Sequence, residues 1–287
     1  MKRVIVNMIL LMSFMQLNAQ TDTVDSLLID LFGNDKTMSH IFDQPSRQSF
    51  FYSGINIDSK TFYAGRELGE NMYSANANIY LFHSSGLYFG ATGSWYSQLD
   101  PRYSSTTVTA GVRGYLTRSN NFSIRASYSR FFFTPSELLT YIPFKNSVGA
   151  GLLLKNDWIG ASLSYNLFFG EESVMNLTPE VFGNITLVRF GRSGRIHLNP
   201  DMSAFFGTET ITTISSLTDT LNSTYTTAEK YGLLNIQAFL PLCISFSGFS
   251  IEAGYNLNFP RTKDRLTEYL VSSSISFSVS YVLPLNW

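Results

Sequence analysis

From Ile275 to Trp287 every second residue is apolar, and this alternation constrains the fold more than any other feature of the chain. The intervening positions begin with a row of serines from Ser274 to Ser280. A period of two is typical of a β-strand, because successive side chains point to opposite faces of the pleat. The apolar row consists of Ile275, Phe277, Val279, Tyr281, Leu283, Leu285 and Trp287. The segment therefore predicts a strand with one apolar face and one face lined by hydroxyl groups.

The same period recurs from Phe50 onward and divides the chain into about twelve candidate strands, with about ten to fourteen compatible with the pattern. Most have the length of about 9 to 11 residues that a tilted strand needs to cross a bilayer. The facing changes around Val188 and Arg189, where we expect a bulge. The strands lie near residues 50–58, 71–83, 87–97, 105–117, 122–132, 147–155, 157–168, 179–190, 195–207, 231–246, 249–259 and 271–285.

The connections alternate between short turns and longer polar links. The short ones, rich in Gly, Asn and Ser, are 84–86, 118–121, 156–157, 191–194 and 247–248. The long ones are 59–70, 98–104, 134–146, 169–178, 208–230 and 260–270. In link 208–230, apolar residues interspersed with hydroxyls, such as Ile211 and Ile214, predict strand extensions. This pattern is typical of an antiparallel up-and-down barrel with short turns at one end and long loops at the other.

Composition favours a membrane wall over a soluble domain. Only 14% of the residues are charged, whereas soluble domains carry about 25%. A soluble sandwich or lipocalin-like barrel would carry charge on its outer face. The net charge of -1 argues against a nucleic-acid partner.

Aromatic residues gather near strand ends, as in interfacial belts: Phe50, Phe122, Trp158 and Phe249 near the turns, and Trp95, Phe131, Phe169, Phe206 and Phe259 near the loops.

The start of the chain predicts export. Lys2 and Arg3 precede an apolar run, and Ala19 offers a cleavage position, so residues 1–19 are interpreted as a signal peptide. The apolar run is shorter than the span of about 20 residues that a transmembrane helix needs. Without such a helix, only a closed barrel of residues 50–287 would sit in a membrane.

Residues 20–49 lack the period of two that marks the rest of the mature chain, and they form a predicted leader. Within 24–32, apolar residues recur at helical spacing: Val24, Leu27, Leu28, Leu31 and Phe32. A helix of about nine residues is marginal alone, so we expect it to dock or to stay loosely ordered. Three interpretations remain open: a loosely ordered periplasmic leader, a plug of the barrel, or a helix that binds an envelope partner.

Together these features resemble the outer-membrane β-barrel proteins of Gram-negative bacteria. The resemblance covers the export signal and residues 50–287, and it is generic to the class. It implies location in the outer membrane, contact with outer-membrane lipid, and insertion by the barrel-assembly machinery. That machinery would read the final strand, so the assembly signal is expected in Phe277, Val279, Tyr281, Leu283, Leu285 and Trp287. An even number of strands places both termini in the periplasm.

The expected lumen contains a pair of arginines. If the 118–121 turn sets Leu116 opposite Phe122, then Arg113 lies directly opposite Arg125, and both point inward. Like charges directly across strands destabilise each other, so water, an acidic group or an anion must offset them. One interpretation is a salt bridge across the lumen, with Glu252 and Asp201 as the acidic groups. The other is a constriction that attracts anions.

A row of polar residues on one strand invites a comparison with hydrolases. His197, Asn199, Asp201 and Ser203 share one face, and some outer-membrane phospholipases use serine, histidine and asparagine. His197 and Ser203 would lie roughly 20 Å apart on a strand, whereas a nucleophile and its base need about 3 Å. We therefore expect a polar lumen lining and no enzyme. The single Cys243 predicts neither disulfide nor thiolate cluster, and no cofactor or metal motif is found.

These observations favour a barrel whose narrow lumen conducts or binds small polar solutes, because the expected inward faces are small, neutral and hydrophilic. The alternative is a non-conducting barrel that serves as a structural or accessory subunit of a cell-envelope complex. The leader helix is the feature that favours this alternative.

Overall fold

The fold is given by a computed structural model, which describes residues 49–63, 66–67, 71–117, 119–135, 144–191, 194–214, 225–261 and 270–285. For 209–214 and 225–229 it describes the backbone pairing only. The predicted signal peptide, the leader with its helix at 24–32, and Trp287 lie outside these residues. Within them, no helix is both long and apolar enough to cross a bilayer.

The described residues form sixteen strands, and twelve of them close an antiparallel barrel. The barrel strands, in order around the wall, are β1 (Ser49–Asp58), β4 (Ser74–Phe82), β5 (Leu87–Tyr96), β6 (Tyr103–Tyr115), β7 (Phe122–Phe133), β8 (Phe144–Lys155), β9 (Ile159–Gly170), β10 (Ser173–Gly183), β13 (Asp201–Ile214), β14 (Tyr225–Phe246), β15 (Phe249–Pro260) and β16 (Ser272–Leu285). The first strand pairs with the last, as Ile55 opposite Val279 shows, so the barrel has no open edge. The predicted up-and-down barrel is confirmed.

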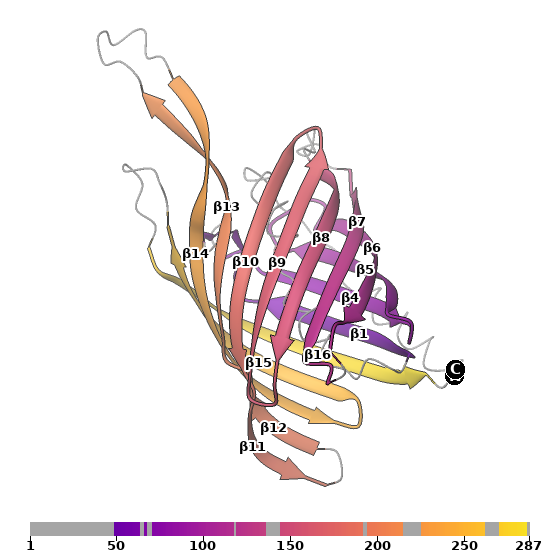
Figure 1. Cartoon of the computed structure of the whole chain (residues 1–287). Coiled ribbons are helices and arrows are strands. Elements are labelled where there is room, and N and C mark those ends of the chain that lie inside the picture. The colour runs from indigo at the N-terminus through magenta and orange to yellow at the C-terminus, as the bar shows by residue number, and fades with distance from the viewer. Residues whose placement is uncertain are drawn as a thin grey trace.

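Two further strands extend the barrel beyond its turn end, the end at which the β4–β5, β6–β7, β8–β9 and β14–β15 turns lie. β11 (Ile185–Phe190) continues β10, and β12 (Gly194–Leu198) continues β13. β12 pairs with β14, whereas β11 has β12 as its neighbour within the described residues. The hairpin therefore projects past the rest of the wall, at the bottom of Figure 1. The register shifts between Thr186 and Val188, at the predicted bulge.

The predicted link 169–178 is wrong. β9 ends at Gly170 and β10 begins at Ser173, so a tight turn replaces the long loop. Asn176 and Thr178 made the segment look like a loop, but they pair with Asn166 and Ser164 and belong to the polar inner face. By contrast, β13 and β14 extend well into the predicted 208–230 link, where they pair as far as Ile214 and Tyr225. This long hairpin rises above the other strands in Figure 1.

The short turns follow their sequence chemistry. Between β14 and β15, Ser247 and Gly248 both have positive φ, at 47° and 86°. This pair of dihedrals is typical of a type I′ turn, whose twist matches that of the flanking strands. Between β8 and β9, the Asn156 side chain accepts hydrogen bonds from the backbone nitrogens of Trp158 and Ile159. Leu116 N donates to Phe122 O, as the predicted register requires.

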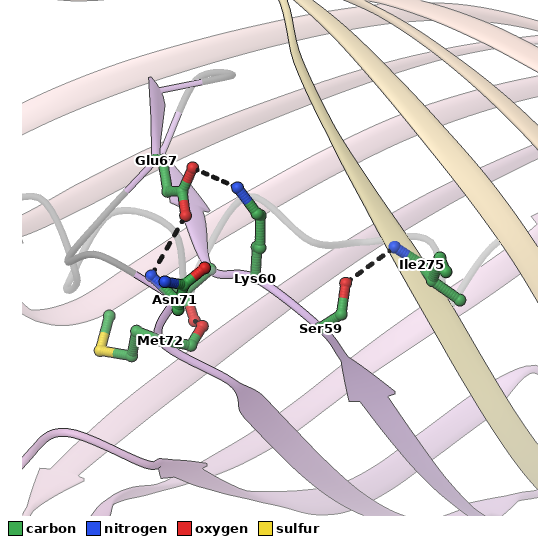
Figure 2. A network of polar contacts seen from close by, with 7 residues as sticks. Ser59, Lys60, Glu67, Asn71, Met72 and Ile275 are labelled. Carbon is green, nitrogen blue, oxygen red and sulfur yellow. Dashed lines mark hydrogen bonds and ion pairs between the residues drawn. The ribbon is translucent and has the colours of Figure 1, made fainter.

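At the loop end, the connection after β1 carries the small hairpin β2 (Phe62–Tyr63) and β3 (Arg66–Glu67). Figure 2 shows how polar contacts fasten this loop. Lys60 Nζ lies 2.7 Å from Glu67 Oε2, and the Asn71 backbone nitrogen donates to Glu67 Oε1 at 3.3 Å. The Ile275 backbone nitrogen donates to Ser59 Oγ at 2.9 Å. The loop is therefore anchored to the final strand, β16.

The outer face of the barrel is apolar and the inner face is largely polar. On β16 the outward residues Ile275 and Phe277 are exposed, whereas Ser274 and Ser276 on the other face are buried. Trp158, Phe249 and Phe259 are exposed near strand ends, as expected for interfacial belts. Phe50 and Phe131 are only 5% exposed because they lie on the inner face, so their assignment to the belts is wrong.

Candidate functional site in the lumen

The inner wall is built from hydroxyl and amide side chains that bond to one another across neighbouring strands. Thr92 Oγ1 donates to Asn78 Oδ1 at 2.7 Å, joining β5 to β4. Gln237 Nε2 donates to Asn256 Oδ1 at 2.9 Å, joining β14 to β15. Because most of these groups are uncharged and mutually bonded, the wall is hydrophilic with little net charge. Further pairs are Asn235 with Asn258, Thr109 with Ser129, and Ser245 with Ser250.

The two predicted arginines lie where the register put them. Arg113 on β6 is directly opposite Arg125 on β7, and both are on the inner face. Arg113 is 8% exposed, and its guanidinium carbon lies 4.4 Å from the centre of the Tyr115 ring. Stacking on an aromatic ring stabilises a cation. Arg113 therefore turns toward Tyr115, toward the turn end of its own strand.

Arg125 extends sideways along the wall. Its Nη2 atom donates to Ser164 Oγ at 2.9 Å, so the side chain crosses β8 and reaches β9. Gly151 is the residue of β8 that it crosses, and a Cβ there would lie 2.9 Å from Arg125 Cγ. The missing side chain of Gly151 is thus what lets the arginine lie flat. Turning in different directions separates the two guanidinium groups that the register brings together.

A carboxylate, Glu180, lies on the inner face close to this contact, because it pairs directly with Ser162, two residues from Ser164 on β9. Glu180 lies on β10, and its Oε2 atom accepts a hydrogen bond from Ser162 Oγ at 2.9 Å. The sequence alone points instead to Glu252 and Asp201 as the acidic partners of the arginines. It misses Glu180, although the predicted strand 179–190 contains this residue, because alternation does not show that Arg125 reaches across β8 toward β9 and β10. The alternation from Val174 to Phe182 contains the signal, since it places Glu180 on the same face as Asn176.

Glu252 belongs to a second group, on the wall formed by β12, β14 and β15. Cys243 Sγ donates to Glu252 Oε2 at 3.0 Å, and Cys243 also pairs with His197 on its other side. His197 is 3% exposed and Cys243 is 2% exposed. The positions directly flanking His197 are held by Thr186 and Cys243. A phospholipase-like site would need a serine nucleophile beside His197. Neither directly paired residue is a serine, so no serine nucleophile lies at those two positions.

Asp201 lies on β13, between β10 with Glu180 and β14 with Cys243. Its directly paired neighbours are Phe182 on β10 and Phe239 on β14. Arg113 and Arg125 therefore lie on one wall and His197 with Glu252 on another, which is the arrangement that the predicted salt bridge across the lumen assumes. The salt bridge itself stays a prediction. Within the described residues, no group of three His, Cys, Asp or Glu side chains is placed to hold a metal ion.

An aromatic cluster fills the turn end of the lumen. Phe50, Tyr52, Tyr80, Phe82 and Tyr88 pack together from β1, β4 and β5. Phe82 stacks on Phe50 and on Tyr88, with ring centres 4.6 Å and 5.3 Å apart. Leu153 on β8 and Val282 on β16 pack against the same cluster. Tyr88 lies over Gly111 on β6, so the cluster extends along the inner face from β1 toward β8, and its large side chains narrow the bore at this end.

A second aromatic cluster lies on the inner face at the loop end. Phe131, Phe144 and Phe168 come from three consecutive strands, with ring centres 6.3 to 6.4 Å apart. Phe133 and Val174 pack against them. On β8, Gly151, over which Arg125 lies, is therefore between Phe144 of this cluster and Leu153, which packs against the first cluster.

No family model matches the chain, and no curated protein matches it. Among solved structures, a KdgM porin is 12% identical and matches 81% of this chain and 98% of its own, with a TM-score of 0.46. An outer-membrane channel from Pseudomonas putida F1 is 9% identical over 92% of this chain and 100% of its own, with a TM-score of 0.45. The translocator domain of the autotransporter NalP from Neisseria meningitidis is 12% identical over 90% and 99%, with a TM-score of 0.43. All three are outer-membrane barrels, and none is close enough to transfer a function to this chain.

Proposed function

We propose that this protein is an exported outer-membrane barrel whose lumen conducts or binds small polar solutes. The outer face supports the membrane location, because large apolar residues are exposed on barrel strands all around the wall. Such a surface is an aggregation liability in water and is covered by lipid in a bilayer. The predicted signal peptide at 1–19 and leader at 20–49 belong to this proposal, with both termini in the periplasm.

The observation that carries the proposed transport role is the polar inner wall with an opposite charge pair, Arg125 and Glu180. Hydroxyl and amide groups replace part of the hydration of an uncharged polar solute without binding it tightly. A charge pair at one level of the bore orients a dipolar solute and sets ion preference. The solute class we propose is therefore small, polar and either uncharged or zwitterionic.

The aromatic cluster around Phe82 supports a second candidate, a non-conducting barrel that is a structural or accessory subunit of an envelope complex. Apolar side chains that constrict a bore exclude water and block ions. In this candidate the leader segment 24–32 binds the periplasmic or envelope partner. The barrel-assembly machinery reads the outward residues of β16 in either case.

Single-channel recording in planar bilayers separates the two candidates. We would compare the mature protein with a form lacking residues 20–48 and with the Tyr88→Ala variant. A transport role predicts discrete conductance of the mature protein or of the truncated form, increased in Tyr88→Ala because the bore widens. Conductance only after truncation would identify the leader as a plug. Silence of all three forms would exclude the transport role and leave the structural role.

Phe259→Ala serves as the matched control, because this aromatic residue lies on the outer face and is 38% exposed. Its replacement changes the lipid contact and leaves the bore unchanged. An equal rise in conductance for Phe259→Ala and Tyr88→Ala would show that aromatic loss acts through the barrel's stability rather than through the constriction.

A further inference from the structure

The lipid face of the barrel contains one exception to its apolar pattern. In the outward rows of β1, β4 to β10, β15 and β16, as far as they are described and apart from Lys145 at the bulge that begins β8, Arg130 on β7 is the one charged residue. It shares its face with Ile124, Tyr128 and Phe132, which are all exposed. Charged residues at the lipid surface of a barrel are unfavourable in the hydrocarbon and tolerated at the headgroup level. Arg130 therefore requires an explanation in terms of what covers this face.

The guanidinium of Arg130 is fixed to the wall by one neighbour. Its Nη1 atom donates to Asn146 Oδ1 at 2.8 Å, and Asn146 is the directly paired residue on β8. Tyr128 Oη donates to the same oxygen at 2.7 Å. Asn146 Oδ1 thus accepts two hydrogen bonds on the outer face, one from Arg130 and one from Tyr128. Because a guanidinium has five N–H donors in a planar fork, this single contact leaves the other edge of Arg130 directed at the surroundings.

The position of this group along the barrel is close to the loop end. Arg130 lies three residues before the end of β7 at Phe133, which places it about 10 Å from the end of the strand. Phe132 and Tyr128 flank it, as expected for residues at a membrane interface. At the start of β8, Lys145 Nζ lies 3.6 Å from Glu171 Oε1. Among the described residues, the nearby pair of Lys145 and Glu171 carries opposite charges, so Arg130 is left as the net positive group of this site.

We propose that Arg130, oriented by Asn146 and Tyr128, binds the phosphate of an anionic lipid headgroup in the leaflet at the loop end. Lipid is what covers the outer wall of a membrane barrel, so the counterion of an outward arginine comes from the headgroup layer. The planar fork of arginine matches phosphate oxygens in two parallel hydrogen bonds. The site rests on membrane insertion and is independent of whether the lumen conducts.

Native mass spectrometry of the full mature protein tests the lipid site. The protein is placed in phosphatidylcholine nanodiscs that contain a minor fraction of phosphatidic acid, and the lipids retained after release are counted. We expect wild-type protein to retain phosphatidic acid in preference to phosphatidylcholine, and Arg130→Gln to weaken this preference about tenfold. Glutamine keeps an amide that can donate to Asn146, so the barrel should still fold. Thermal unfolding of each variant in the nanodiscs checks this.

Two further arms make the outcome decisive. Arg189→Gln removes an exposed arginine of β11 that pairs with Arg195 in the projecting hairpin, and it should leave lipid retention unchanged. Inorganic phosphate added in excess should not displace the lipid, because the acyl chains also contact the apolar wall. Equal retention by wild type and Arg130→Gln, or displacement by inorganic phosphate alone, would overturn the proposal. Arg130→Lys should give intermediate retention, since it keeps the charge and loses the fork.

Discussion

The Arg125 guanidinium and the Ser164 hydroxyl meet at 2.9 Å although their strands, β7 and β9, are not neighbours. The contact spans β8 above Gly151, which pairs with Arg125 on one side and with Ser164 on the other. Gly151, which has no side chain, therefore determines where the positive charge of Arg125 lies in the lumen. Two other large inward side chains also lie over a glycine of the neighbouring strand: Tyr80 over Gly90, and Tyr88 over Gly111.

Gly151→Ala should destabilise the barrel by about 1–3 kcal/mol, because the new methyl group forces Arg125 away from Ser164 in a packed wall. Urea-induced unfolding in lipid vesicles measures this change. Gly114→Ala is the matched control, since the nearest atom to its added Cβ is Ile124 Cγ1 at 3.7 Å. We expect the control to change stability by less than about 0.5 kcal/mol. Equal effects at the two glycines would contradict the role of Gly151.

Arg125→Ser should shift the ion preference of a conducting barrel toward cations, because the negative charge of Glu180 then remains in the lumen without the positive charge of Arg125. Glu180→Gln should shift it in the opposite direction. The reversal potential under a salt gradient measures both shifts. The effect should diminish at high salt, where the Debye length falls to about 3 Å at 1 M.

Arg113→Ser serves as the comparison for this pair, because its guanidinium lies against Tyr115 instead of reaching toward β9. We expect a smaller shift than for Arg125→Ser. Unchanged selectivity in all three variants would remove the charge pair from the proposed transport path.

Gly248→Ala should destabilise the hairpin that joins β14 to β15 more than Gly191→Ala destabilises the projecting hairpin. Both glycines have positive φ, 86° and 60°, so each alanine carries a backbone cost of about 1–2 kcal/mol. At Gly248 the added Cβ would also lie 2.5 Å from the carbonyl oxygen of Val282, whereas at Gly191 nothing lies within 4 Å. Chemical unfolding of the two variants tests the difference, and a reversed order would contradict it.

Phe277→Asn should reduce the amount of assembled barrel several-fold, because it puts an amide on the lipid face of β16 and interrupts the proposed assembly signal. Ser278→Asn on the inner face is the control, since amides are already common there. The folded fraction in outer-membrane preparations, read from heat-dependent gel mobility, gives the comparison. Similar losses for both variants would show that β16 is sensitive to any substitution rather than to its outer row.

The period of two in the sequence determined the strands, their facing and much of their register. It placed Ser274 and Ser276 on the inner face, and it set Arg113 opposite Arg125 through the contact of Leu116 with Phe122. These are local relationships, because hairpin register follows from the turn between two consecutive strands. The same local logic failed at Asn176, where inward polar residues look like those of a loop.

Only the tertiary structure decided which side chains share a level of the bore. It brought Glu180 close to the contact of Arg125 with Ser164, His197 to Cys243, and Leu153 to the aromatic cluster around Phe82. The physical reason is that alternation specifies the face on which each residue lies. It does not specify the residue's height along the barrel axis relative to residues on distant strands. That height depends on strand stagger around the whole wall, which is fixed only when the last strand closes on the first.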